Sequence, residues 1–293
     1  MNANTARALR RSPANPTGGL PVVAGLNYLV PTGERPFSYA CEPPAGAPWE
    51  SGRYELRQMA IADARSGAPS PAIDVEGFEL WEAPTVVRDF FDPEEVRATY
   101  YAEATELALA VTGAQRAHVF DHLVRRRERD RAPVSFGRKP AAGPPAVNGR
   151  IHSDYTEASG RRRLAMVLSD ALAAARVERY AIINIWRSIK GPVRDTPLAV
   201  CDARSVAASD LVESEVRYPR RTGEIYHARH SPRHRWSYFS GMDRHEALVF
   251  KQYDSRTCGV ARFVLHTAFD LPQIPADAPL RESIELRCLV IYD

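Results

Sequence analysis

The sequence predicts a mainly β fold with flanking helices, a double-stranded β-helix of the jelly-roll (cupin-like) kind. Three observations favour this class. Short β-type runs follow one another from residue 179 to the end, and turn residues such as Gly191, Gly223 and Gly241 separate several of them. Helical patterns are confined to two earlier segments, and no internal repeat is visible. Many short strands at this spacing are typical of a sandwich or a barrel.

The chain is expected to divide into a short tail and one large domain. Residues 1–20 are rich in Pro, Asn and Arg and are predicted to be a disordered tail. Residues 21–293 are predicted to form a single jelly-roll domain with an N-terminal extension. That extension starts with two extended segments, residues 23–30 and 53–64, which the turn-rich residues 43–52 separate.

The clearest helix is predicted over residues 92–112. Asp92 can cap its start, and Pro93 suits its first turn. Glu95 can reach back to the cap, and Gly113 can end the helix. One apolar stripe runs along it, made of Val96, Tyr100, Ala104, Leu107 and Val111. The helix should therefore cover a hydrophobic surface, and we expect it on the outer face of the larger sheet.

The remaining elements follow in chain order. Residues 117–124 resemble a strand, and the Pro-rich residues 132–150 are expected to be a loop that delivers the chain to His152. A second helix is predicted from about residue 157 to residue 174. The predicted later strands are 179–189, 197–206, 223–231, 235–240, 246–254, 261–269 and 282–293.

Charge and composition narrow the choice of partners. The net charge is +3, so nothing global indicates nucleic acid or an anionic membrane. The basic runs 125–127 and 161–163 are interpreted as solvated faces. No stretch reaches the ~18 apolar residues of a membrane span. The four cysteines lack a Cys-x-x-Cys spacing, which argues against a disulfide framework and favours a reducing cytoplasm.

Several common catalytic motifs are missing from the sequence. It contains no Gly-x-Gly-x-x-Gly after a strand, no phosphate-binding loop and no Gly-x-Ser-x-Gly elbow. Nicotinamide, ATP and serine-hydrolase chemistry therefore lose support.

A His-x-Asp pair within the stretch "NGRIHSDYTE" predicts a metal site. His152 and Asp154 lie on the same side of an extended segment, because strand side chains alternate with period 2. His266 lies on a strand-like run 114 residues later (266 minus 152) and can supply a third ligand. This order is the one expected for the two-histidine, one-carboxylate triad, which holds Fe(II) and leaves positions open for a co-substrate and dioxygen.

The C-terminal strand offers an anchor for 2-oxoglutarate. Arg281 lies 15 residues beyond His266 (281 minus 266), and Ser283 shares its face. A guanidinium fork with a hydroxyl suits the distal carboxylate of that co-substrate. Asn184 lies in a deeply apolar run, so it either has a buried partner or faces a ligand. We include it among the candidate cofactor-binding residues.

Two further groups of side chains are candidates for the surroundings of the metal site. The cluster of His227, His230 and His234 is a rival metal site. The favoured interpretation is that these histidines form a basic rim that lines a pocket. The candidate substrate-binding residues are Trp186, His234, Trp236, Tyr238 and Lys251. They are expected to line or rim the cavity of the metal and to receive a medium-sized natural product, one that could carry a carboxylate or another anionic group.

Three long segments resemble a known family. Residues 184–206, 234–255 and 266–293 are similar to the CmcJ/AsaB-like hydroxylase/desaturase family, which includes the fungal gibberellin desaturase. The similarity covers roughly residues 55–293. It implies an oxidoreductase of secondary metabolism, of the hydroxylase or desaturase type, with dependence on Fe(II) and 2-oxoglutarate reported or inferred for some members.

Together these observations predict a non-haem Fe(II), 2-oxoglutarate-dependent dioxygenase that hydroxylates or desaturates a small natural product. The alternative is a non-catalytic or zinc-binding jelly-roll protein that acts as one partner of a two-component biosynthetic system. Metal analysis of protein purified without a histidine tag would separate the two.

Overall fold

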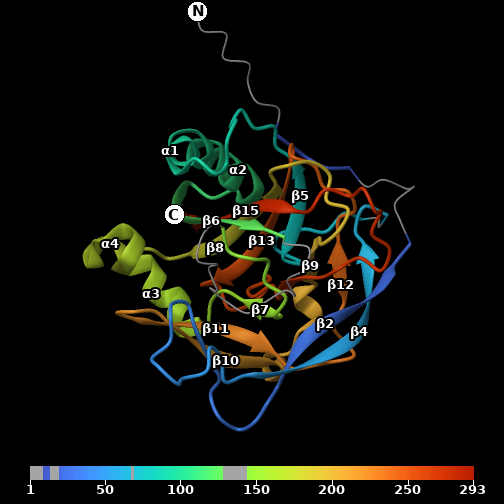
Figure 1. Ribbon diagram of the computed structural model, residues 1–293. Helices are drawn as coiled ribbons and strands as arrows, with labels where there is room; N and C mark the ends of the chain where they lie inside the picture. The colour runs from blue at the N-terminus through green and yellow to red at the C-terminus, as the bar shows by residue number, and fades with distance from the viewer. Residues whose placement is uncertain (1–8, 14–19, 67–68, 128–143) are drawn as a thin grey trace, which may run out of the picture.

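The computed structural model describes residues 9–13, 20–66, 69–127 and 144–293. It contains two β-sheets that face each other, with helices at the periphery (Figure 1). The mainly β, jelly-roll class predicted from the sequence is confirmed. No described helix is long and apolar enough to cross a membrane.

The smaller sheet has six strands, and every neighbouring pair in it is antiparallel. In spatial order these are β1 (Arg10–Arg11), β5 (Phe78–Glu82), β13 (Glu246–Asp254), β8 (Tyr180–Ser188), β15 (Glu282–Ile291) and β6 (Arg116–Arg126). β1 belongs to the part of the chain expected to be a disordered tail, and its pairing with β5 corrects that expectation for these two residues. Residues 1–8 and 14–19 of the expected tail lie outside the described residues.

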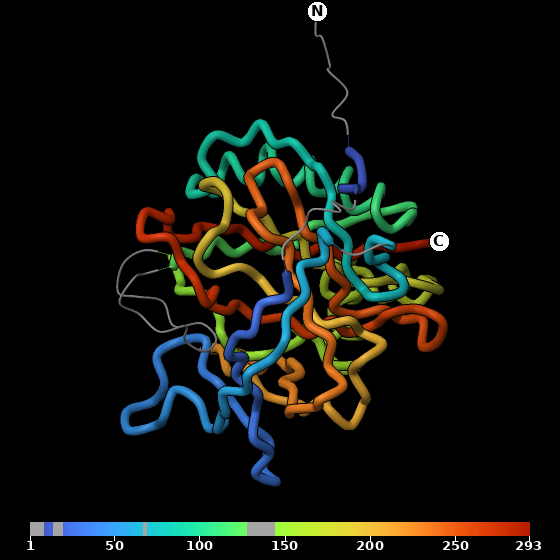
Figure 2. Tube along the Cα trace, turned by 90° about the vertical axis from the view of Figure 1, so that its right-hand side faces the viewer, coloured from blue at the N-terminus to red at the C-terminus, as the bar shows by residue number. Residues whose placement is uncertain are grey.

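The larger sheet has nine strands. In spatial order they are β2 (Val22–Val30), β4 (Arg53–Asp63), β12 (Trp236–Tyr238), β9 (Leu198–Cys201), β14 (His266–Ala268), β7 (His152–Ser153), β11 (Thr222–Ala228), β10 (Leu211–Arg217) and β3 (Phe37–Tyr39). β2 and β4, in blue, run side by side at one edge (Figure 2). β5 and β10 were not predicted from the sequence, since they lie in segments without a strong alternating pattern.

The strongest predicted helix is present, and a π-helical turn interrupts its α-helical geometry. It comprises α1 (Pro93–Glu95), the π-helical turn η1 (Val96–Tyr100) and α2 (Tyr101–Thr112). The Asp92 side chain accepts a hydrogen bond from the Glu94 amide, and Gly113 ends α2 with a φ of 66°. Glu95 reaches beyond the cap, because its carboxylate accepts from the amides of Arg88 and Asp89.

This helix covers the six-stranded sheet, not the larger one as expected (Figure 1). The five residues of its apolar stripe are all buried. They pack against alternate side chains of β8 and β15, among them Ile183, Ile185 and Leu286. Because that face of the smaller sheet is mainly apolar, it needs a cover, and the helix supplies one. The buried Arg187 on the same face donates from Nε to the Tyr100 hydroxyl of the helix at 2.9 Å.

The second predicted helix is broken in two. α3 (Glu157–Leu168) ends at Ser169, which adopts a left-handed conformation with φ of 54°. α4 (Ala171–Ala175) starts anew with Asp170 as its cap. Two short 3₁₀ turns, η2 (Ala203–Ser205) and η3 (Ala208–Asp210), follow β9. The first of them lies within residues 197–206, where the sequence predicted a longer strand. The expected loop at 132–150 is described only from residue 144 onward.

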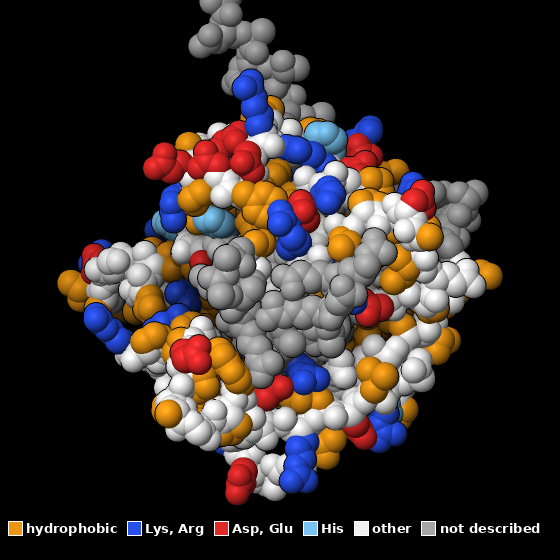
Figure 3. Space-filling view, viewed as in Figure 1, with side chains coloured by type: hydrophobic (Ala, Val, Ile, Leu, Met, Phe, Trp, Pro, Cys, Tyr) orange, Lys and Arg blue, Asp and Glu red, His pale blue; other side chains and the backbone are white. Residues whose placement is uncertain are grey.

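Over the face shown in Figure 3, basic and acidic side chains are interspersed, and a recess opens at the left of the molecule.

Candidate metal centre

Two neighbouring strands of the larger sheet carry the two predicted histidine ligands. His152 on β7 is directly opposite His266 on β14, and their ring centroids are 4.1 Å apart. Asp154 follows β7 immediately. His266 thus lies on a strand adjacent to β7 in the same sheet, and not on a strand of the opposite sheet. All three side chains are buried.

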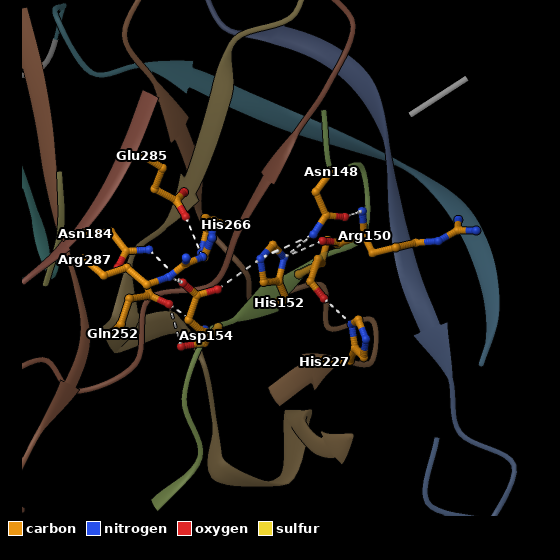
Figure 4. A network of polar contacts seen from close by, with 12 residues as sticks. Asn148, Arg150, His152, Asp154, Asn184, His227, Gln252, His266, Glu285 and Arg287 are labelled. Atoms are coloured by element: carbon orange, nitrogen blue, oxygen red, sulfur yellow. Dashed lines mark hydrogen bonds and ion pairs between the residues drawn. The ribbon is translucent and has the colours of Figure 1, made fainter. Parts of the chain in front are cut away.

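The three side chains form a compact group of potential metal ligands. One ligand atom from each lies within 4.8 Å of the other two. His152 Nε2 is 3.4 Å from Asp154 Oδ1 (Figure 4). Among the described residues, no other group of three His, Cys, Asp or Glu side chains lies close enough together to share one ion.

Backbone carbonyls orient both imidazoles toward the cluster. His152 Nδ1 is 2.7 Å from the Arg150 carbonyl oxygen, and His266 Nδ1 is 3.4 Å from that of Val264. A neutral imidazole that donates from Nδ1 keeps its lone pair on Nε2, which is the form that binds a metal. Burial, with the nearby His152, lowers the pKa of His266 well below its ordinary value, so that ring is neutral.

The two carboxylate oxygens of Asp154 have different surroundings. Oδ2 accepts hydrogen bonds from Arg287 Nε at 2.8 Å and Asn184 Nδ2 at 2.9 Å. Oδ1 is buried and has no hydrogen-bond partner. The Asp154 amide donates to Gln252 Oε1 at 2.6 Å, which holds the backbone in place (Figure 4). Burial alone would raise the pKa of Asp154, but the Arg287 charge holds that pKa well below its usual range.

These observations fit a divalent metal ion. A buried, ionised carboxylate oxygen without a partner is costly unless a cation or a donor meets it. Two imidazole nitrogens beside it complete a set of three ligands on one side of an ion. Asn184, which was predicted to bind a cofactor, instead holds the ligand Asp154.

The opposite sheet presents a polar stripe to this cluster. On β15 and the residue before it, Arg281, Ser283, Glu285 and Arg287 alternate with apolar side chains that face the helix. A narrow cavity lies between the sheets, lined by Asn148, His152, Trp186, His266, Arg281 and Ser283 among others. The structure thus brings Arg281, Ser283 and Trp186 to the histidine ligands.

Arg281 retains unused donor capacity in this cavity. Its Nη1 donates to the Thr196 carbonyl at 2.7 Å, and its Nε is buried without a partner. The guanidinium carbon lies 5.5 Å from the ring centroid of Trp186. Burial lowers the pKa of Arg281 to about 9, and an anion in the cavity would oppose that shift by stabilising the charged form.

Three of the candidate substrate-binding residues lie elsewhere. Trp236 and Tyr238 pack in a core cluster with Ala199 and Cys201, on the face of β9 opposite to Leu198, which lines the narrow cavity. His234 is stacked on Tyr28, and both His234 and Trp236 hydrogen-bond to the Tyr28 hydroxyl. Both faces of this strand region are buried, so the sequence pattern could not tell which face meets the site.

Lys251 is also absent from the lining of the narrow cavity. Its side chain is fully buried, and its ammonium lies 2.5 Å from Asp74 Oδ1 and 2.9 Å from Asp254 Oδ2. The expected substrate contact is corrected to an internal ion-pair network. His227, from the rival histidine cluster, donates from Nδ1 to the Ile151 carbonyl and accepts at Nε2 from the Tyr54 hydroxyl. It does not join the group of potential metal ligands.

Sequence reasoning missed several residues of the site. Glu285, Gln252, Asn148 and Arg287 were not among the predicted site residues. The alternation that identified Arg281 and Ser283 continues through Glu285 to Arg287, so extending it along the strand would have found both. Nothing comparable in the sequence points to Gln252.

Comparisons with known proteins agree with this site. A family model described as oxidoreductase/YMDC permease-like domain matches residues 26–291. Hydroxylase/desaturase efuI of Hormonema carpetanum is 33% identical over 82% of this chain and 85% of that protein. The alpha-ketoglutarate-dependent dioxygenase tstK of Talaromyces stipitatus is 32% identical over 81% of this chain and 86% of that protein. A solved structure of the iron and alpha-ketoglutarate-dependent endoperoxidase NvfI has a TM-score of 0.81 at 25% identity, covering 93% of this chain and 98% of that one.

A jelly roll with two histidines and one carboxylate buried between its sheets defines the class of non-haem metal oxygenases. The chain belongs to the oxidoreductase family of that matching model, and hydroxylase/desaturases and dioxygenases are its named relatives. The expected resemblance to hydroxylase/desaturases is confirmed.

Proposed function

We propose that the chain is an Fe(II)- and 2-oxoglutarate-dependent oxygenase that hydroxylates or desaturates a small natural product. His152, Asp154 and His266 hold the iron, and Arg281 with Ser283 binds the distal carboxylate of 2-oxoglutarate. The observation that carries this proposal is the buried three-ligand cluster, in which Asp154 Oδ1 accepts no hydrogen bond and lies 3.4 Å from His152 Nε2. The names of relatives such as hydroxylase/desaturase efuI and the dioxygenase tstK support the reaction class.

The protein and the metal have separate tasks in this reaction. Bound iron with open positions supplies the activation of dioxygen and the oxidation of a C–H bond. The protein keeps the His266 imidazole neutral and the Asp154 carboxylate ionised, with the carboxylate fixed by Arg287 and Asn184. Burial of the three ligands limits access of bulk water to the site.

The products follow from the balance of the reaction. Hydroxylation consumes one dioxygen and one 2-oxoglutarate and yields the alcohol, succinate and carbon dioxide. Desaturation consumes the same co-substrates and yields the alkene, water, succinate and carbon dioxide. A mass gain of one oxygen or a loss of two hydrogens in the product therefore distinguishes the two outcomes. All four cysteines are free, which supports the further proposal that the protein works in a reducing cytoplasm.

The metal assignment is tested by the His266→Ala variant. We expect this variant to lose bound iron while it retains its fold, because one of three ligands is gone. The exposed His245 provides a matched control, and His245→Ala should keep its iron content. The readouts are metal content by mass spectrometry and far-ultraviolet circular dichroism. Full iron content in His266→Ala would refute the assignment, and zinc in place of iron would favour a non-catalytic role.

The co-substrate assignment is tested by Arg281→Ala. Anaerobic calorimetric titration of the metal-loaded protein should show 2-oxoglutarate binding weakened at least tenfold, about 1.4 kcal/mol, with metal affinity unchanged. The reason is that Arg281 contributes a charged partner for the carboxylate but no ligand to the ion. Unchanged affinity for 2-oxoglutarate would place the anchor on another residue.

A further inference from the structure

A second and larger cavity adjoins the candidate metal centre. Its volume is about 500 Å³, and side chains from β6, α3 and the β10–β11 hairpin line it. Asp154 and Arg287 form part of its wall, and Leu123 and Arg125 line both this cavity and the narrow one. The larger cavity therefore reaches the metal ligands from a side different from that of Arg281.

The charge of this cavity is predominantly positive. Five arginines line it, Arg125, Arg162, Arg163, Arg221 and Arg287, against the three carboxylates Asp121, Asp154 and Glu224. Arg287 pairs with Asp154 and Asp121, and Arg162 pairs with Glu224. Among the described residues, no carboxylate lies within ion-pair distance of the other three arginines. The cavity thus has a surplus of positive charge, and Figure 3 shows basic side chains inside the recess at the left of the molecule.

This result corrects the interpretation of two basic runs as solvated faces. Arg125 and Arg163 are only partly exposed, and both face a cavity. Arg161 lies two residues before Arg163 on α3. Its side chain is exposed to solvent and pairs with Glu157. The helical repeat of 3.6 residues explains the difference, because residues two apart on a helix lie on different faces.

Arg163 is held in a way that suits an anion. Its guanidinium carbon lies 4.7 Å from the ring centroid of Phe120 and 5.7 Å from that of Tyr155. These rings restrict its position, and its Nε is buried without a hydrogen-bond partner. A guanidinium held in place beside aromatic rings binds a carboxylate well, because little side-chain freedom remains to be lost.

The rest of the wall is mainly apolar. Leu123, Tyr155, Met166, Val216 and Ile225 contribute to it. Such a surface suits the carbon skeleton of a ligand, while a few polar groups set its orientation.

We propose that this cavity is the substrate pocket and that it takes an organic acid, whose carboxylate Arg163 binds while its carbon skeleton lies against the apolar wall. The inference rests on the proposed function, because the cavity matters for substrate only if Asp154 holds the reactive metal. The acid is distinct from 2-oxoglutarate, which is assigned to Arg281 in the narrow cavity.

A pair of fluorescent probes tests the charge preference directly. 1-Pyrenebutyric acid and 1-pyrenebutanol share one ring system, and only the first carries a carboxylate. In fluorescence titrations, we expect the wild-type protein to bind the acid at least tenfold more tightly than the alcohol. Arg163→Met should lose at least tenfold in affinity for the acid and little for the alcohol. Arg161→Met, on the same helix but outside the cavity, should behave as the wild type.

Two outcomes would overturn the inference. One is equal affinity of the wild type for acid and alcohol, and the other is unchanged affinity for the acid in a folded Arg163→Met protein. If that variant does not fold, salt titration of the wild type decides the question, since sodium chloride should weaken binding of the acid and not of the alcohol. An equal response of both probes to salt contradicts the proposal.

The probe titrations need neither turnover nor iron, so the two proposals can fail separately. Loss of the acid preference in a protein that binds iron through His266 refutes only the pocket assignment. A retained acid preference in a protein that binds no iron refutes the oxygenase assignment and with it the role of the cavity as a substrate pocket, but leaves Arg163 as the residue that binds the acid.

Discussion

At the scale of single residues, the two carboxylate oxygens of Asp154 have different roles. Oδ2 is saturated by Arg287 and Asn184, whereas Oδ1 is left for an ion. This arrangement favours binding through one oxygen, because a bidentate ligand would have to give up two charge-assisted hydrogen bonds. Residues outside the ligand set therefore decide how the ligand binds.

The Asn184→Ala variant tests this division. Removing one donor from Oδ2 frees the carboxylate to rotate, so we expect affinity for Mn(II) or Fe(II) to fall about 10- to 100-fold. Metal titration followed by fluorescence or calorimetry measures the effect. A melting curve of the metal-free protein controls for damage to the core, since Asn184 is fully buried. Unchanged metal affinity would show that Arg287 suffices to orient Asp154.

Lys251 illustrates a buried charge with a structural role. Its ammonium contacts Asp74 and Asp254, and the Asp254 side chain is itself fully buried. We expect Lys251→Met to lower the free energy of unfolding by about 3 kcal/mol because it leaves Asp254 with only Arg179 as a charged partner. Metal binding should be unaffected.

Urea unfolding of Lys251→Met and of a control variant measures this loss. Lys190 is exposed, and its Nζ lies 3.6 Å from Glu282 Oε1. Because exposed ion pairs contribute little, Lys190→Met should change the free energy of unfolding by less than about 0.5 kcal/mol. If Lys251→Met were as stable as Lys190→Met but impaired in ligand binding, the original substrate-binding hypothesis would be restored.

At the scale of elements, alternation along β15 gives one strand two functions. Ile284, Leu286 and Cys288 pack toward the helix, while Ser283, Glu285 and Arg287 point into the space between the sheets. A shift of the register by one residue would exchange the two sets and bury charges against the helix. The long pairing of β15 with both β6 and β8 holds the register in place.

The end of α2 offers a test of local backbone control. Gly113 has a φ of 66°, and a Cβ added there would meet no atom within 4 Å. Gly113→Ala should therefore cost about 1 kcal/mol of stability through backbone strain alone. Gly113→Asn should cost less, because asparagine tolerates the left-handed region better. Equal urea midpoints for wild type and Gly113→Ala would contradict this account.

At the scale of the whole molecule, the site depends on two sheets at once. The larger sheet supplies the three potential ligands, through β7, the residue Asp154 after it, and β14. The smaller sheet supplies the partners of those ligands and the candidate anchor, through β8 and β15. Packing of one sheet on the other therefore sets the geometry of the site, and a mutation that loosens that packing should affect metal binding.

The interior also shapes the dependence of stability on pH. Burial raises the pKa of the Cys201 and Cys288 thiols to about 12. Between pH 9 and pH 12 the unfolded thiols ionise while the folded ones stay protonated, so the stability they contribute is full below pH 9 and declines above it. Urea unfolding at pH 8, 9, 10 and 11 should show this decline.

Cysteine variants separate the thiols from other buried groups. Cys288→Ala should make the decline above pH 9 shallower, whereas Cys258→Ala should not, because Cys258 is exposed. A thiol reagent should label Cys258 in the native protein, but Cys201 and Cys288 only in urea. Identical pH profiles for wild type and Cys288→Ala would contradict the assignment of this effect to the buried thiol.

Local patterns in the sequence determined much of this protein. The caps at Asp92 and Gly113 and the apolar stripe of the helix were predictable, because they depend on neighbours within a few residues. The run of short strands predicted the jelly roll, and the His-x-Asp spacing predicted a shared face for His152 and Asp154.

Only the tertiary structure decided which of these faces meet. That His266 lies beside His152, that Trp236 and Tyr238 turn away from the narrow cavity, and which sheet the helix covers all depend on strand pairing between distant segments. In a strand buried on both faces, such as β8, hydrophobicity does not distinguish the side that meets the site from the side that packs in the core. Likewise, a run of arginines has the same composition whether its members meet solvent or a cavity. The fold assigned Arg161 to the former and Arg163 to the latter.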